Sequence, residues 1–118
     1  MSRLDNLIAD RDTSHWNLRR FRSKVYDDFV ALEEATFAAG ALPTKTKELI
    51  AVGIAIRANS EPEIHAHIEN AAEHGASLDE LVEAIEVGIE MGGAPAMESA
   101  RFSFLVLDRL FSQQILQR

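Results

Sequence analysis

Residues 49–56 form an uninterrupted apolar run, LIAVGIAI, near the middle of this 118-residue chain. Pro43 and Thr44 precede the run by a few positions and are typical of the first turn of a helix. A helix without a polar face must be enclosed by its neighbours. Gly53 lies inside the run, at a cost of roughly 1 kcal/mol relative to alanine, and therefore suggests that another backbone comes close there. We expect a central helix covered on every side.

The rest of the chain is divided into helices, because no stretch alternates polar and apolar residues for long enough to predict a strand. Apolar residues recur every three to five positions over about 15–39, which predicts one long amphipathic helix with Gly40 as its C-terminal cap. Pro95 predicts a last helix over about 95–116, with apolar residues on more than one face. The predicted fold class is all-α, in a single domain over 1–118.

Two helices between these are predicted from capping boxes, in which a serine is followed three residues later by a glutamate. Ser60 and Glu63 form the first, and Ser77 and Glu80 the second. Glycine follows the end of each segment, at Gly75 and at 92–93. These signals predict one helix that is capped by Ser60 and ends at Gly75, and another that is capped by Ser77 and ends at 92–93.

Composition limits the classes of partner. The chain has a net charge of −7 without a cluster of basic residues, so the electrostatic footprint of nucleic-acid or anionic-membrane binding is missing. No apolar segment is long enough to cross a bilayer, and residues 1–12 have no apolar stretch typical of a signal peptide, so a cytoplasmic protein is expected. The predicted helices carry more apolar surface than a small monomer hides, which predicts a homo-oligomer.

The chain contains no cysteine, which removes disulfides, thiolate metal ligands and thiol nucleophiles. Any chemistry must therefore use carboxylates and imidazoles. Glu63 and His67 are four residues apart, so they share a helix face and their side chains can touch, as a general acid/base pair requires. Glu48 precedes the apolar run and lines up with its apolar positions, so its surroundings are expected to be dry.

Three segments of the sequence resemble the carboxymuconolactone decarboxylase and alkyl hydroperoxidase D-like (AhpD-like) family. They are LPTKTKELIAVGIAI, SEPEIHAHIENAAEHGAS and EAIEVGIEMGGAPAM, within about 42–100. The resemblance implies an AhpD-like helical bundle that assembles into symmetrical homo-oligomers, commonly trimers or hexamers. It also implies an active site near a subunit contact.

The hydroperoxidase branch of this family uses a glutamate, a C-x-x-C pair and a histidine. Glu48 and His67 match the ends of that relay, whereas Ser60 and Glu63 stand where the cysteines would be. The decarboxylase branch keeps a glutamate four residues before the histidine, as Glu63 and His67 do here. The resemblance therefore implies a lyase-like acid/base enzyme acting on a small carbonyl or lactone compound, with Glu48, Glu63 and His67 as its catalytic residues.

Other interpretations of these residues stay open. Glu63 could only close a capping box, and Glu48 could only stabilise a helix dipole. No cofactor is expected, although Glu48, Glu63 and His67 could bind a divalent metal, with His65 or Glu90 completing the shell. The protein would then be a non-catalytic or metal-binding oligomer. Peroxiredoxin activity, the label that the family attracts, is disfavoured because a serine hydroxyl cannot replace a thiol in that reaction.

Overall fold

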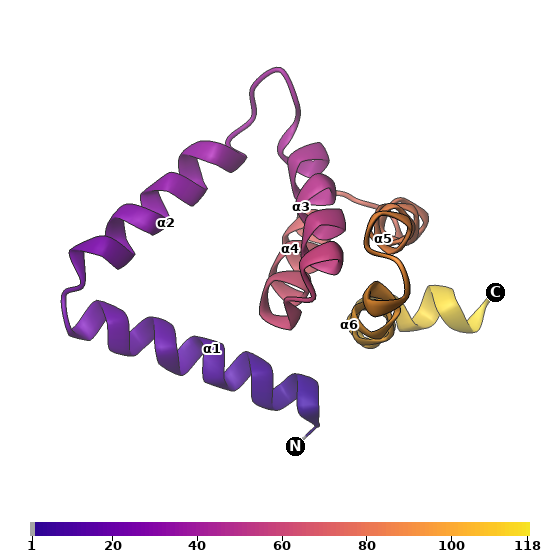
Figure 1. Cartoon of the computed structure of the whole chain (residues 1–118), viewed down its shortest axis with the longest axis horizontal. Helices are drawn as coiled ribbons and strands as arrows, with labels where there is room; N and C mark the ends of the chain where they lie inside the picture. Colours follow the sequence, from indigo (N-terminus) through magenta and orange to yellow (C-terminus); the bar gives the residue numbers. More distant parts are fainter. Residues whose placement is uncertain (1) are drawn as a thin grey trace. The chain divides into compact units, whose positions relative to one another are not determined.

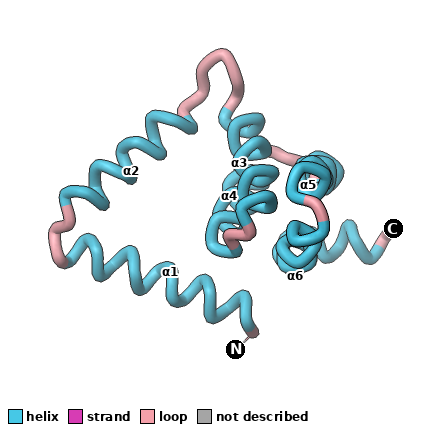
Figure 2. Tube along the Cα trace, viewed as in Figure 1, coloured by secondary structure: helices cyan, strands magenta, loops and turns pink. Residues whose placement is uncertain are grey.

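The computed structural model describes residues 2–118, and these contain six helices and no strand (Figures 1 and 2). The predicted all-α class is confirmed. No helix in this described part of the chain is both long enough and apolar enough to cross a membrane. The chain divides into two compact units, residues 1–39 and 40–118, and each is described by itself. The single domain stays a prediction. The helices are α1 (Arg3–Arg20), α2 (Lys24–Phe37), α3 (Thr44–Ala58), α4 (Glu61–Glu73), α5 (Leu78–Gly92) and α6 (Ala94–Leu116).

The first unit is a pair of helices, so the prediction of one helix over about 15–39 is wrong. Arg22 has a φ of 53°, a left-handed conformation that ends α1. The Ser23 side chain then accepts a hydrogen bond from the backbone N–H of Tyr26 and starts α2. The apolar residues recur with the same periodicity on both sides of this break. The sequence pattern therefore gave no sign that Ser23 begins a new helix. Gly40 is not a helix cap either, because α2 ends at Phe37 and Ala38 is extended.

The second unit is built around α3, which packs against α4, α5 and α6. Helix α6 also packs on α4 and α5, so the four helices enclose one apolar core. In Figure 1, α3 and α4 overlap near the centre of the view, and α5 and α6 lie to their right. The fully buried larger side chains of this core are Val52, Ile56, Ile64, Ile68, Leu81, Ile85, Val106 and Leu107.

The close backbone approach predicted at Gly53 is confirmed. A Cβ atom at Gly53 would lie 3.3 Å from the carbonyl oxygen of Ala84, and one at Gly88 would lie 2.7 Å from the carbonyl oxygen of Gly53. Glycines on α3 and α5 therefore let the two helices touch. Helix α3 is not covered on every side, however, since Ile50 and Ile54 are 50% and 63% exposed. That prediction is wrong for the isolated chain.

The two predicted capping boxes have different outcomes. At the start of α5, Ser77 and Glu80 exchange side-chain and backbone hydrogen bonds, as predicted. At the start of α4, Ser60 makes no side-chain cap hydrogen bond, so the box with Glu63 is wrong. The Glu63 carboxylate contacts His67 instead.

Candidate active site

The three residues predicted to carry chemistry meet in the second unit. Glu48 lies in the first turns of α3, whereas Glu63 and His67 lie four residues apart on α4. Nδ1 of His67 is 2.7 Å from Oε2 of Glu48, and Nε2 of the same ring is 3.0 Å from Oε2 of Glu63. The imidazole therefore bridges two carboxylates, and both arms of the bridge come from one chain.

The two carboxylates have different environments. The Glu48 side chain is only 4% exposed and that of His67 is 12% exposed, but that of Glu63 is 60% exposed. Glu48 is buried because its position on α3 shares a face with Val52 and Ala55, which lie in the core. Glu63 is in the first turn of α4 and faces water. The site therefore runs from a dry end at Glu48 to a wet end at Glu63.

The contacts determine how many protons the site holds. A neutral imidazole has one N–H, and a carboxylate can only accept a hydrogen bond. Two nitrogen–oxygen contacts therefore need two protons, on an imidazolium between two carboxylates or on a neutral ring beside one carboxylic acid. In both arrangements the three groups carry a net charge of −1, and the 3.0 Å contact joins the ring to the exposed carboxylate of Glu63.

Two further residues considered as ligands lie outside this cluster. Nε2 of His65 lies 3.2 Å from Oε2 of Glu69, a pairing within α4 that does not involve Glu48 or Glu63. Glu90 is an exposed residue of α5. Neither joins the bridge. The sequence did not predict that His67 lies between the two carboxylates, because the spacing on α4 does not show which ring nitrogen each carboxylate contacts.

The arrangement does not suit one metal ion. The two carboxylates contact opposite nitrogens of His67, and an ion bound at one nitrogen cannot also be near the carboxylate at the other. Within residues 2–118 there is no group of three or more histidine, aspartate or glutamate side chains placed to hold a metal. A metal would require Glu48 or Glu63 to leave the ring.

Comparison with known proteins defines the class. The model of the carboxymuconolactone decarboxylase family matches residues 23–104, and the chain belongs to this family. It is a member without the two cysteines of the redox branch. The match extends further toward the N-terminus than the segments that carry the sequence resemblance, and it includes α2.

Two relatives are similar in sequence. One is a Paracoccus denitrificans protein named "Uncharacterized protein 4 in cox locus", 36% identical over 91 residues, which cover 77% of this chain and 82% of the relative. The other, from Cupriavidus necator, is named "Uncharacterized protein H16_B0147". It is 33% identical over 82 residues, covering 70% of this chain and 73% of the relative.

Solved structures share the fold. A carboxymuconolactone decarboxylase family protein of Legionella pneumophila superposes with a TM-score of 0.83 at 27% identity, over 89% of this chain and 94% of that one. A family protein of Thermotoga maritima has a TM-score of 0.81 at 22% identity, over 95% of both chains. The AhpD-like helical bundle implied by the sequence is confirmed.

Proposed function

We propose that this protein is an acid/base enzyme acting on a small carbonyl or lactone compound, in which Glu63 exchanges a proton with the substrate. The observation that carries the proposal is the bridge from buried Glu48 through His67 to exposed Glu63. Both ring nitrogens of His67 are occupied, so a substrate meets Glu63 before it meets the imidazole. His67 then passes protons to and from Glu63, and Glu48 is a positioning residue that holds the ring.

Decarboxylation is the reaction type that this site supports best. When a carboxylate beside a carbonyl leaves as CO₂, its bonding electrons move into an enolate, and the enolate carbon must then take up one proton. His67 passes its Nε2 proton to Glu63, Glu63 delivers that proton to the enolate carbon as a carboxylic acid, and the exposed end of the site then regains a proton from water. In this scheme the ring begins as an imidazolium beside the Glu48 carboxylate, and neither a metal nor a thiol takes part. The substrate, a small carbonyl or lactone compound, is part of the proposal.

The experiment is a screen of small lactones and keto acids for CO₂ release, followed by variants of the site. General acid/base groups contribute about 10²–10⁴-fold to rate, so Glu63→Gln and His67→Ala should each lower kcat by about 100-fold or more. Glu69→Gln is a matched control, because it removes a carboxylate from α4 outside the bridge. Turnover that is unchanged in both site variants would overturn the proposal.

A non-catalytic, metal-binding oligomer is the alternative from the sequence. The opposed carboxylates weigh against it, because one ion cannot use all three groups as they lie. Native mass spectrometry of protein purified without chelator separates the two. One retained metal ion per subunit, lost in Glu48→Gln, would favour the alternative. Cytoplasmic placement stays a prediction from the sequence.

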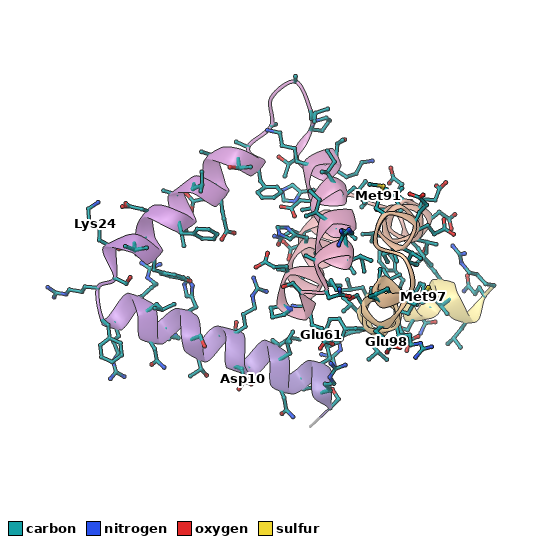
Figure 3. All side chains as sticks on the ribbon, viewed as in Figure 1. Asp10, Lys24, Glu61, Met91, Met97 and Glu98 are labelled. Carbon is teal, nitrogen blue, oxygen red and sulfur yellow. The ribbon has the colours of Figure 1, made fainter. Side chains whose placement is uncertain are left out.

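We also propose that the protein is a homo-oligomer, a trimer or hexamer as the resemblance implies. Four apolar side chains on α3 and α5, Ile50, Ile54, Val87 and Met91, are between 50% and 65% exposed. On each helix they flank the contact at Gly53 and Gly88 on the side away from the core, so they form one face. Figure 3 shows Met91 projecting from α5. Packing this face against other copies of the chain would bury the apolar side chains of α3 that are exposed in the single chain.

A further inference from the structure

A cavity lies between α5 and α6, in helices that contribute none of the three bridge residues. Its volume is about 390 Å³, which is within the usual range for small-molecule sites. Most of its lining is apolar, from Leu78 and Val82 on α5 and from Phe104, Leu105, Leu107 and Ile115 on α6. Two charged residues, Asp108 and Arg118, also line it.

A break in α6 gives the cavity its far wall. Phe111 has non-helical angles, with φ at −125° and ψ at 25°, so the last part of the helix changes direction there. This change lies between Phe104 and Asp108 on one side and Ile115 on the other, and all three line the same cavity. Arg118 forms an ion pair with Asp79 in the first turn of α5, which joins the end of the chain to that helix. The cavity is therefore bounded by α5 and α6 and is open to solvent, with Arg118 and its ion pair to Asp79 at one end.

The two charged lining residues are not equivalent. The guanidinium of Arg118 is already paired with Asp79. Asp108, in contrast, makes no hydrogen bond or ion pair with any residue in the described range 2–118, and it is exposed. The cavity thus has an apolar body and one carboxylate whose charge nothing in this range offsets. An apolar molecule bearing a positive charge complements both features.

We infer that this cavity binds a small apolar amine. Its ammonium group pairs with Asp108, and its hydrocarbon part packs against Val82, Phe104 and Leu105. An exposed ion pair contributes modestly, so the apolar contacts supply most of the affinity and the charge supplies the preference. The inference does not depend on the proposed acid/base activity, because the two sites share no residue.

Hexylammonium, hexanol and hexanoate test this directly, since they share one hydrocarbon chain and differ in the charge of the head group. Binding to the full-length protein is followed by ¹H–¹⁵N NMR. Hexylammonium should saturate at one molecule per chain, shift the resonances of α5 and α6, and bind about two- to fivefold more tightly than hexanol. Hexanoate should bind more weakly than hexanol.

Variants locate the site. Asp108→Asn should remove the preference for the amine over the alcohol, whereas Asp12→Asn, which removes the same charge on α1, should keep it. Val82→Trp, which fills the cavity, should abolish binding of all three probes. The inference is overturned if no probe saturates at millimolar concentration. A second copy of the chain covering the cavity would give that result. Hexanoate binding as tightly as hexylammonium, or an amine preference that survives in Asp108→Asn, would overturn it equally.

Discussion

Nδ1 of His67 lies 2.7 Å from Oε2 of Glu48, which joins an imidazole of α4 to a carboxylate of α3 that is almost fully buried. Burying a carboxylate is costly unless it is paired and hydrogen-bonded. His67 provides this partner, and its other nitrogen connects the pair to exposed Glu63. The same contact thus joins α3 to α4 and links a buried carboxylate to an exposed one through the ring.

The first prediction concerns the unequal burial of the two carboxylates. Glu48→Ala should lower the free energy of unfolding by about 1–3 kcal/mol, because it leaves Nδ1 of a nearly buried ring without its acceptor. Glu63→Ala should cost less than about 1 kcal/mol, because its ion pair is largely exposed. Urea denaturation of both variants measures the difference. If both variants lost the same free energy of unfolding, the two carboxylates could not differ in burial as the structure shows.

The second prediction concerns the contact between α3 and α5. A methyl group at Gly88 would lie 2.7 Å from the Gly53 carbonyl oxygen and 2.7 Å from Cβ of Ile56, so Gly88→Ala should destabilise the protein by about 1–3 kcal/mol. Gly40→Ala is the control, because a Cβ there would meet only Nζ of Lys47, at 3.8 Å. Thermal unfolding compares the two. A Gly88→Ala variant as stable as Gly40→Ala would show that the helices are further apart.

The third prediction separates the two serines that the sequence treats alike. Ser77→Ala removes a hydrogen bond to the Glu80 backbone N–H and should cost about 1 kcal/mol of stability. Ser60→Ala should be close to neutral, because the Ser60 side chain makes no cap hydrogen bond. Both variants are compared by chemical denaturation. If Ser60→Ala lost as much stability as Ser77→Ala, the Ser60 side chain would have to cap α4, which would contradict the structure.

The fourth prediction is a dependence of stability on pH. The backbone N–H of Ser77 donates to the Glu80 carboxylate, and Lys45 lies 3.1 Å from it, and both lower the pKa of Glu80 below its usual 4.5. The stabilisation is therefore complete above pH 4.5 and is lost as the pH falls through the lowered pKa. Glu80→Gln should be less stable than the wild type at pH 7, and this difference should shrink at acidic pH.

Glu83→Gln is the control for this prediction, because Glu83 is an exposed residue of the same helix and makes none of these contacts. Its stability should follow that of the wild type at both pH values. A difference between wild type and Glu80→Gln that stays constant from pH 7 to pH 3 would contradict the lowered pKa.

Local sequence signals predicted much of the second unit. The Ser77 and Glu80 pair indicated a helix start from residues within one turn. Gly53, a glycine inside an apolar helix, indicated that another backbone comes close, although the sequence did not show that this backbone belongs to α5. The same reasoning failed at Ser60, where the Glu63 side chain contacts His67 one turn further along α4 and does not close the cap. It also failed at Arg22, where a left-handed residue interrupts an apolar pattern that continues on either side.

The sequence predicted which three residues form the site, but not that His67 lies between the two carboxylates. The spacing of Glu63 and His67 brings them to one face of α4, which any helix would do. The position of Glu48 depends on how α3 packs against α4, and that packing is set by core residues far from it in the chain. The cavity of α5 and α6 was not predicted at all, because the break at Phe111 has no signal in the sequence.

The most direct test of the bridge is ¹H–¹⁵N NMR of the ring nitrogens of His67 in wild type, Glu48→Gln and Glu63→Gln. The account predicts that Glu48→Gln shifts mainly the Nδ1 resonance and Glu63→Gln mainly the Nε2 resonance, with both nitrogens sharing protons with oxygen in the wild type. A ring whose two nitrogen resonances respond to neither variant would contradict the bridge, and with it the proposed acid/base function.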